Sequence, residues 1–573
     1  MINKCETQLV EWVQSAFSAA FGDEHDWSSL KVVPATDKKF GDFQCNDAMQ
    51  LAKTLRMAPR AISEKAVAAV PLPEMLTSVE VAGPGFINLT VKKKWLAEQV
   101  EELAAADNFG IQDVGKGCTV IIDYSSPNVA KPMHIGHIRS TVIGAALDRL
   151  YRALGYKVVA DNHLGDWGTQ FGILIMGYRH CLSDGERKNL TVELLERAYV
   201  ESYNKTREDN KWIDACRAEL VKLQKGDSAN TDVWKRFIEI SLDEFNRIYE
   251  RLDVRFDLYR GESFYHDMLA ETVQLLEDKG LAEESEGALV VKLEEEELPL
   301  CIVRKSDGGF NYTTTDIATV LSRETEFDPV KIVYVTDERQ QLHFQQFFAV
   351  CKRLGIETNL EHVWFGLMRL PEGTFSTRQG NVIKLEALLD EAESRALKII
   401  RGSGRDIPEN EQKALAAAIG IGAIKYADLS HDPQTLVTFT WEKALALEGN
   451  SGPYLQYAYA RVCSLLDKYA DKVDDRDPLG NRLLPETPVE RELVLKLMQF
   501  PGTVLRAAEL YKPNVLADYL FTLSQLYSRF YQSSPVLKAE DDIRDSRVKL
   551  CAMVAKVLGE GLHLLGISTP RRI

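Results

Sequence analysis

A lysine and two histidines form the first group of residues in this chain whose types and spacing could do chemistry. Lys131 precedes His134 and His137, which are three residues apart and would share one face of a helix. Their imidazole N–H groups could point at one anion, and Lys131 adds a formal positive charge. Gly136 has no Cβ and would let a flat adenine or ribose approach the backbone closely. These residue types suit the binding of a nucleoside triphosphate.

The surrounding sequence predicts the elements that must position these residues. A strand-like stretch, 118–124, precedes a Pro-containing loop and a long amphipathic segment that ends near Gly155. A helix beginning at the histidines adds its unpaired N–H groups and the positive end of its dipole to the anion site. Two histidines on a helix can also be an ordinary surface or core pair. Strand, loop and helix start in this order are, however, typical of a doubly wound sheet, where ligands bind beyond the carboxyl ends of strands.

The whole chain divides into three predicted domains. Residues 1–112 mix helical stretches with a strand pair and predict an α+β domain without a catalytic cluster. Residues 113–448 predict a Rossmann-like α/β catalytic domain with a mainly parallel sheet, interrupted by a charged helical insertion at about 182–287. Residues 449–573 predict a separate all-α domain. The strands expected in the α/β domain are 118–124, 157–162, 288–291, 301–304, 331–335 and 363–365.

Composition excludes several classes of protein. The net charge is −16, from 69 basic and 85 acidic residues, so we expect no DNA partner, and RNA would have to be met by a local basic face or by stacking. The chain has no apolar run of about 18 residues and no signal-type N-terminus, so we expect a cytoplasmic protein without membrane contact. The 9 cysteines are scattered without paired spacing, which favours reduced thiols and predicts no zinc or other metal site.

Several segments, in this order, resemble those of class I aminoacyl-tRNA synthetases and specifically of arginyl-tRNA synthetases. They are DYSSPNVAKPMHIGHIRST (123–141), NHLGDWGTQFG (162–172), NYTTTDIA (311–318), IKYADLS (424–430) and GPYLQYAYAR (452–461). The resemblance implies that arginine attacks the α-phosphorus of ATP, bound with Mg²⁺, to give arginyl-adenylate and pyrophosphate. The arginyl group then moves to the 3′-terminal adenosine of tRNA(Arg). We expect the enzyme to be a monomer.

The resemblance also implies roles for residues of the nucleotide site. His134, Gly136 and His137 would bind ATP, and the histidines would stabilise the charge that builds up in the in-line transition state. This catalysis is electrostatic and positional, with no covalent enzyme intermediate.

The family's second signature, a Lys-Met-Ser-Lys-Ser loop, is degenerate at residues 375–381. Thr377 stands where the usual catalytic lysine is found. Lys131, just ahead of the histidines, fits the compensating role, and Arg378 is expected to assist it. A solvated polar loop is the alternative for Arg378. The residues of this loop that are expected to bind ATP are Ser376 and Gly380.

A selective arginine pocket needs carboxylates placed for paired hydrogen bonds and a flat wall, because a guanidinium ion is planar and always charged. Tyr312 and Asp316 are four residues apart and would share a helix face, and the resemblance places both at the arginine side chain. A helix N-cap is the alternative for Asp316. The resemblance makes Asp123 the second acidic position. The other expected arginine-binding residues are Asn128 and Gln340, for the α-amino and carboxylate groups, and His134.

Four residues after the second strand of the sheet are expected to shape the ATP or arginine site, because a switch-point crevice would lie there. They are His163, Gly165, Asp166 and Trp167, and no individual role is assigned to them. His343 and His362 are expected to be structural.

Aromatic residues provide the expected tRNA contacts. Tyr457 and Arg461 would share one helical face and Tyr531 lies on a later helix, in what resembles the family's anticodon-binding domain. Stacking suits an acidic protein because it needs no large basic field, although a tyrosine stripe is otherwise more often core. The N-terminal domain resembles the family's additional domain, which contacts the tRNA D-loop. Its expected contact residues are Phe86 and Asn88.

Two alternatives remain open at this point. A nucleotidyltransferase that adenylates a small cofactor precursor shares the His-x-Gly-His motif and the sheet, but it does not explain the helical C-terminal domain or Tyr312 with Asp316. A catalytically idle synthetase-like protein would only bind RNA or another synthetase. The intact Lys131, His134 and His137 disfavour that second alternative.

Overall fold

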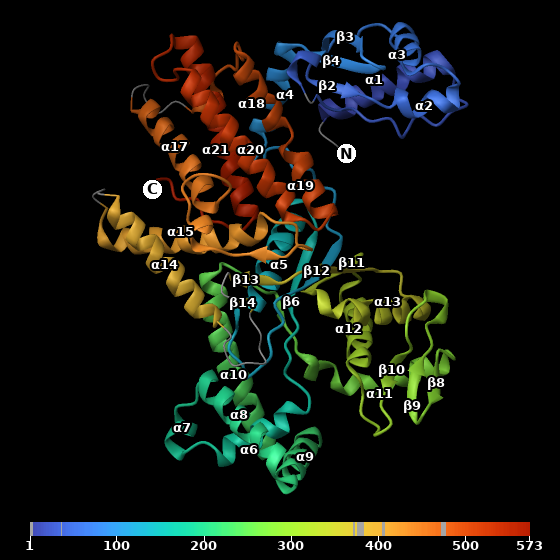
Figure 1. Cartoon of the computed structure of the whole chain (residues 1–573), viewed down its shortest axis with the longest axis vertical. Coiled ribbons are helices and arrows are strands. Elements are labelled where there is room, and N and C mark those ends of the chain that lie inside the picture. Colours follow the sequence, from blue (N-terminus) through green and yellow to red (C-terminus); the bar gives the residue numbers. More distant parts are fainter. Residues whose placement is uncertain (1–3, 36, 371–372, 375–382, 404–406, 472–476) are drawn as a thin grey trace.

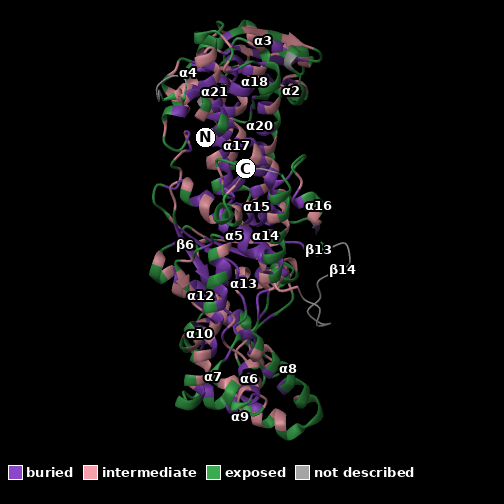
Figure 2. Ribbon diagram, turned by 90° about the vertical axis from the view of Figure 1, so that its left-hand side faces the viewer, coloured by how far each residue is buried: buried purple, intermediate pink, exposed green. Residues whose placement is uncertain are grey.

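A central parallel sheet separates the two ends of an elongated molecule, shown in Figure 1 and, turned by 90°, in Figure 2. The N-terminal domain and the C-terminal helices lie at one end, and a group of inserted helices lies at the other. The structure is a computed structural model and describes residues 4–35, 37–370, 373–374, 383–403, 407–471 and 477–573. Within these ranges no helix combines the length and the apolar character that crossing a membrane requires.

The N-terminal domain is built on an antiparallel sheet with the strand order β1-β2-β4-β3. Residues 83–85 turn the chain between β3 and β4, as the sequence predicts. Arg491, in the C-terminal helices, pairs with Asp42 at 2.5 Å and so joins the two domains. The elements are β1 (Val33–Pro34), β2 (Phe43–Cys45), β3 (Leu76–Ala82), β4 (Phe86–Val91), α1 (Lys4–Phe21), α2 (Ala48–Leu55), α3 (Pro59–Ala68) and α4 (Lys93–Ala105).

The central sheet is parallel throughout, with the strand order β12-β11-β5-β6-β7. The strand order reverses between β5 and β11, so a ligand site is expected beyond their carboxyl ends. Val120, Ile121 and Ile122 of β5 are fully buried, because a central parallel strand is covered on both faces. The strands are β5 (Thr119–Asp123), β6 (Lys157–Asn162), β7 (Leu258–Tyr259), β11 (Lys331–Asp337) and β12 (Asn359–Phe365).

Two strands expected in the parallel sheet belong to a different sheet. The segments 288–291 and 301–304 do form strands, but 288–291 pairs antiparallel both with 301–304 and with a third strand, in the order β10-β9-β8. Glu286 and Gly287 have φ values of 53° and 79°, which makes a two-residue hairpin turn and reverses the chain. The elements of this region are β8 (Ala282–Ser285), β9 (Ala288–Val291), β10 (Cys301–Arg304), α11 (Leu269–Asp278), α12 (Tyr312–Phe327) and α13 (Gln341–Leu354).

The inserted helices form the end of the molecule opposite the N-terminal domain (Figure 1). The range predicted as an insertion, 182–287, also contains β7, which pairs with β6 in the parallel sheet. The chain therefore returns to the central sheet immediately after the last inserted helix. The helices are α6 (Gln170–His180), α7 (Asp184–Lys188), α8 (Val192–Glu208), α9 (Asn210–Gln224) and α10 (Ser228–Arg251).

The C-terminal part is helical, as predicted, but the segment 489–505 forms two helices instead of one. Pro501 lies in the first turn of the second helix, where its missing N–H does no harm. The helices are α14 (Leu385–Gly402), α15 (Glu409–Leu429), α16 (Trp441–Ala444), α17 (Gly452–Ala470), α18 (Pro488–Met498), α19 (Phe500–Glu509), α20 (Pro513–Ser533) and α21 (Asp541–Leu564).

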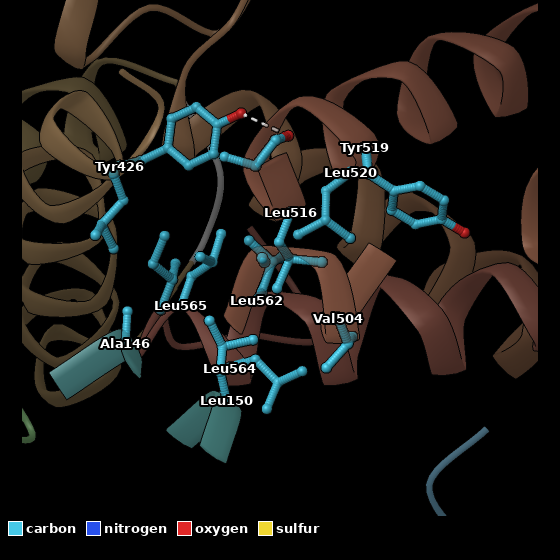
Figure 3. Close-up of a cluster of buried hydrophobic side chains, with 14 of the residues drawn as sticks. Ala146, Leu150, Tyr426, Val504, Leu516, Tyr519, Leu520, Leu562, Leu564 and Leu565 are labelled. Carbon is cyan, nitrogen blue, oxygen red and sulfur yellow. Dashed lines mark hydrogen bonds between the residues drawn. The ribbon is translucent and has the colours of Figure 1, made fainter. Parts of the chain in front are cut away.

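A shared hydrophobic core joins the C-terminal helices to α5 (Ile135–Ala153), the helix that begins at the histidine motif. Figure 3 shows Ala146 and Leu150 of α5 beside Leu562 of α21 and Leu516 of α20. All four side chains are at least 95% buried. The rear of α5 is therefore fixed by the C-terminal domain, while its N-terminus lies at the edge of the sheet formed by the carboxyl ends of the strands.

Candidate active site

The two histidines cap the N-terminus of α5. The backbone N–H of Gly136 donates to Nδ1 of His134 at 3.0 Å, and the backbone N–H of His134 donates to Nδ1 of His137 at 3.1 Å. Because each Nδ1 is an acceptor, a neutral ring carries its proton on Nε2. The ring centroids are 3.9 Å apart, so α5 begins with two neighbouring Nε2–H donors.

Burial keeps both imidazoles neutral at physiological pH. It lowers the pKa of His137 to about 3, with repulsion from His134 contributing. It also lowers the pKa of His134, and the positive charges of Lys131 and Arg339 add to that shift. The histidines are therefore hydrogen-bond donors and not cations. The formal charge beside them comes from Lys131 and from Arg339, a residue just beyond β11 that sequence reasoning missed.

The space above Gly136 is filled by the His134 ring. A Cβ at position 136 would lie 2.8 Å from Cε1 and 2.9 Å from Nδ1 of His134. We expected the missing Cβ to admit an adenine or a ribose, but its first effect is to admit the imidazole that caps the helix. Gly136 is exposed, and approach of a nucleotide to its backbone stays a prediction.

Lys131 rests on an aromatic side chain of the inserted helices. Its Nζ lies 5.4 Å from the ring centroid of Tyr199, on α8. Tyr199 stacks in turn on Tyr203, with centroids 6.0 Å apart and ring planes 13° from parallel. A cation over an aromatic face is attracted to it, so α8 restricts where the ammonium group of the exposed Lys131 can lie.

The degenerate signature loop contains Ser376, Arg378 and Gly380, and all three lie outside the described residues. Their expected roles therefore stay predictions. The segment that follows the loop is described, and two backbone hydrogen bonds of 2.9 and 3.1 Å join residues 383–385 to residues 133–135. Residues 383–385 are thus attached directly to the histidine motif.

The expected tyrosine and aspartate occupy the first turns of α12. Asn311 is the N-cap of this helix, which excludes the N-cap alternative for Asp316. Tyr312 is the first helical residue and is 64% exposed. An oxygen of Asp316 lies 2.5 Å from Nε2 of His343, on α13. His343, which we expected to be structural, therefore contacts a residue of the expected arginine pocket.

The other histidine expected to be structural has that role. His362 makes a hydrogen bond of 2.7 Å with the Thr336 hydroxyl and stacks on Phe344 at 4.1 Å. Burial lowers the pKa of His362 to about 4. It packs between β11, β12 and α13 as part of the fold.

A carboxylate that sequence reasoning missed interacts electrostatically with Asp316. Glu262 begins the short helix η2 (Glu262–Met268), directly after β7. Burial raises the pKa of Glu262 to about 8, and repulsion from Asp316 and Asp166 adds to the shift. Glu262 also contributes to the raised pKa of Tyr312. A guanidinium ion among these carboxylates would relieve their repulsion. No sequence spacing pairs positions 262 and 316, and only the fold brings them together.

Asp123 is not a free carboxylate. Its side chain is 7% exposed, and one oxygen accepts a hydrogen bond of 2.6 Å from Arg323. The other oxygen accepts one of 3.1 Å from the Ser126 hydroxyl. Arg323 also donates to Asp161 at 2.8 Å and lies 5.5 Å from the ring centroid of Tyr334. Two acids and an aromatic wall thus hold a guanidinium that belongs to the chain itself.

This arrangement corrects the expected arginine pocket. We expected Asp123 and Asp316 to flank one bound cation, but the partner of Asp123 is Arg323. The carboxylate that interacts with Asp316 is Glu262. A direct contact between Asp123 and a substrate stays a prediction, and support of the loop after β5 is what the structure shows.

The last two expected arginine-binding residues are exposed at the same edge of the sheet. Asn128, in the loop after β5, forms a bridge with Gly165, in the loop after β6. A Cβ at Gly165 would lie 2.3 Å from Oδ1 of Asn128, so the glycine makes room for that side chain. Gln340 follows β11 and is the N-cap of α13. All the expected substrate residues that the structure describes thus follow carboxyl ends of strands or lie on the helices that begin there.

Comparison with known families accounts for nearly the whole chain. The family model described as "tRNA synthetases class I (R), catalytic domain" matches residues 99–441. The model "Arginyl tRNA synthetase N terminal domain" matches residues 7–91, and "DALR anticodon binding domain" matches residues 455–573.

Curated relatives match at similar length. A protein of Fusobacterium nucleatum subsp. nucleatum named arginine–tRNA ligase is 45% identical over 540 residues, which cover 94% of each chain. The chain belongs to the arginyl-tRNA synthetase family. Another relative with this name, from Chromobacterium violaceum, is 42% identical and covers 98% of each chain. Membership of this family overturns the alternative of a nucleotidyltransferase for small cofactor precursors.

Solved arginyl-tRNA synthetases have the same fold. The enzyme from Plasmodium falciparum superposes with a TM-score of 0.86 at 26% identity, covering 100% of both chains. The Thermus thermophilus enzyme gives a TM-score of 0.83 at 25% identity and covers 99% of this chain and 100% of its own. The three-part architecture, with its α/β catalytic domain, is therefore that of the arginyl-tRNA synthetases.

The residues expected to bind tRNA lie away from the ligand-binding edge of the sheet. The guanidinium of Arg461 lies 4.8 Å from the ring centroid of Tyr457 and 5.8 Å from that of Tyr531. Tyr531 is 43% exposed, so part of its ring is open to a partner. In the N-terminal domain Phe86 is half-buried, whereas Asn88 is 5% exposed and accepts a hydrogen bond of 2.7 Å from Gln44. Of these two residues, Phe86 is therefore the one whose side chain is more accessible for a contact with tRNA.

Proposed function

We propose that this chain is an arginine–tRNA ligase. It activates L-arginine with ATP to arginyl-adenylate and then transfers the arginyl group to the 3′ adenosine of tRNA(Arg). The observation that supports the proposal is that two groups of side chains, suited to the two substrates of the first reaction, lie at one edge of the parallel sheet. Neutral imidazole donors at the N-terminus of α5 suit a triphosphate, and the carboxylates of Glu262 and Asp316 suit a guanidinium.

On the ATP side, catalysis is electrostatic. The Nε2–H groups of His134 and His137, with the positive end of the α5 dipole, stabilise negative charge that moves onto the phosphate oxygens. Lys131 supplies the positive charge that the degenerate loop lacks at Thr377, and Arg378 assists it. ATP is used as its Mg²⁺ complex, in which the phosphates supply most of the metal ligands.

On the arginine side, selection follows from the shape of the cation. Asp316 and Glu262 accept hydrogen bonds from the planar guanidinium, and the Tyr312 ring lies along it. Lysine would neutralise the same charge but leave carboxylate oxygens unpaired. Asn128 and Gln340 hold the α-amino and carboxylate groups so that a carboxylate oxygen meets the α-phosphorus in line.

The two terminal domains bind tRNA in this proposal. Residues 449–573 bind the anticodon loop, whose bases stack on Tyr531 and on the Arg461 guanidinium. Residues 1–112 contact the D-loop through the strand that begins at Phe86. The enzyme acts as a cytoplasmic monomer without a DNA partner. A net charge of −16 supports selective stacking over general binding to polyanions. Light scattering of the free enzyme tests the monomer.

The test is aminoacylation of total tRNA with each labelled amino acid in turn. The proposal predicts that arginine alone is attached and that the charged tRNA is tRNA(Arg). Binding of tRNA without charging by any amino acid would support the catalytically idle alternative. Charging with lysine would retain the enzyme class and overturn the assigned specificity.

A further inference from the structure

The loop between β5 and α5 has a strained backbone. Ser125, Ser126 and Ala130 have φ values of 71°, 45° and 64°, in the left-handed region that residues with a Cβ rarely adopt. Residues held there persist only where their surroundings fix them. The same loop carries Asn128 and Lys131, so this conformation decides where the proposed arginine and ATP contacts lie.

Helix α10 makes two of the contacts that fix this loop. The backbone N–H of Ala130 donates to the Ser241 hydroxyl at 2.9 Å. The hydroxyl groups of Ser125 and Tyr249 are 2.8 Å apart, and the Tyr249 hydroxyl also accepts a hydrogen bond of 3.1 Å from Asn162. Ser241 and Tyr249 are fully buried and eight residues apart, which places them on one face of α10.

The same helix also holds the loop after β6. Nε1 of Trp234 donates to the backbone carbonyl of Asp166 at 2.8 Å. The Asp166 carboxylate accepts hydrogen bonds of 2.8 and 2.6 Å from the backbone N–H and the hydroxyl of Ser263, next to Glu262. Trp234 lies seven residues before Ser241 and so faces the same way. One face of an inserted helix thus spans the loops that follow both central strands.

We propose that Ser241 and Tyr249 are positioning residues for arginine activation. They hold the loop after β5 in its left-handed conformation, so that Asn128 and Lys131 meet arginine and ATP. Neither residue touches a substrate. The inference rests on the roles proposed for Asn128 and Lys131, and it assigns to the inserted helices a part in catalysis.

The Ser241–Ala130 contact makes a specific rescue possible. In Ser241→Ala the Ala130 N–H is left buried without its acceptor, which favours a different loop conformation. Glycine adopts positive φ without strain, so Ala130→Gly lowers the free energy of the native loop relative to others. If Ala130→Gly only weakened packing, it would add to the loss of activity in Ser241→Ala. Because it favours the native loop backbone, it should instead restore activity.

The experiment measures arginine-dependent ATP–pyrophosphate exchange in the presence of tRNA for Ser241→Ala, Tyr249→Phe and the double variant Ser241→Ala with Ala130→Gly. Thr272→Ala is the matched control, because Thr272 is a buried hydroxyl on α11 that donates to the Met268 carbonyl at 2.9 Å, at the junction of η2 and α11, and not to the loop after β5. Thermal melting confirms that each variant is folded. Tyr249→Phe removes a single oxygen atom and keeps the inference testable if Ser241→Ala does not fold.

We expect Ser241→Ala and Tyr249→Phe each to lower kcat/KM for arginine by about 10-fold. The double variant should recover to within about 3-fold of the native enzyme, and Thr272→Ala should stay within about 2-fold. The inference is overturned if Ser241→Ala and Tyr249→Phe behave like Thr272→Ala, or if Ala130→Gly gives no rescue. Asn128→Ala and Lys131→Ala, measured in parallel, test the underlying site assignment separately.

Discussion

The backbone N–H of His134 donates to Nδ1 of His137, 3.1 Å away, and this bond fixes the tautomer of the second ring. A neutral His137 must then carry its proton on Nε2, where it can be donated to a ligand. Two hydrogen-bond donors without formal charge, at the positive end of a helix dipole, suit a phosphate whose negative charge increases in the transition state.

His137→Ala is therefore expected to lower the rate of adenylate formation by about 10² to 10³, the effect of removing one such donor. Pyrophosphate exchange at saturating arginine and ATP measures it. His563→Ala, at an exposed position on α21, is the control and should leave the rate unchanged. An unchanged rate in His137→Ala would remove this residue from the transition state.

Asp316→Asn should raise the KM for arginine by about 100-fold and leave the KM for ATP within about 3-fold, because it removes a negative charge that would pair with the guanidinium and not with ATP. Steady-state exchange with each substrate varied separately gives both constants. Asp278→Asn, on α11, is a matched exposed control. Equal changes in both constants would show that the variant disturbs the fold instead of the pocket.

Arginine affinity should depend on pH through Glu262. Its pKa is raised to about 8 in the ligand-free enzyme, and a bound guanidinium favours the ionised carboxylate, so arginine binding below pH 8 releases a proton. The KM for arginine should then fall as pH rises from about 6 to 8, by up to about tenfold per unit, and level off above. Glu262→Gln should bind arginine weakly and flatten this profile. A native KM that is constant over this range contradicts the assignment.

Lys131 should matter more than Arg378 for adenylate formation. Lys131→Ala is expected to lower kcat by more than Arg378→Ala does, because the lysine is fixed close to His134 and Tyr199. Tyr199→Leu should lower kcat by about 2- to 5-fold, the worth of one exposed cation–π contact, while Tyr199→Phe keeps the ring and the rate. A larger loss in Arg378→Ala would assign the compensating charge to the loop.

Tyr531→Ala should raise the KM for tRNA by about 5- to 100-fold, since stacking of one base on an aromatic ring contributes about 1–3 kcal/mol. Aminoacylation at saturating arginine and ATP measures it. Tyr531→Phe retains the ring and should behave like the native enzyme. If both variants have the native KM, the ring is part of the helical core and not a platform for a base.

Local patterns were enough to predict the elements around the histidine motif. The helix start at His134, the strand before it and the helical C-terminal domain all follow from short-range periodicity and motifs. The strand at 288–291 was expected in the parallel sheet because a short apolar run does not indicate its partner. Its antiparallel pairing with 282–285 depends on the turn at Glu286 and Gly287.

The acidic group proposed to bind arginine could not be predicted in full, because its residues are brought together over long sequence distances. Glu262 and Asp316 meet through the packing of η2 against α12, which no spacing reveals. We expected two acids and an aromatic ring to surround the guanidinium of the substrate. This arrangement does occur, but around Arg323, which the sequence does not distinguish from any other helical arginine.

The most direct test of the central claim is ATP–pyrophosphate exchange with each amino acid, with and without total tRNA. We expect exchange with arginine alone, and only when tRNA is present, as the family resemblance implies. Exchange supported by lysine or glutamate would contradict the pairing of imidazole donors with a guanidinium-selective acidic group at one edge of the sheet.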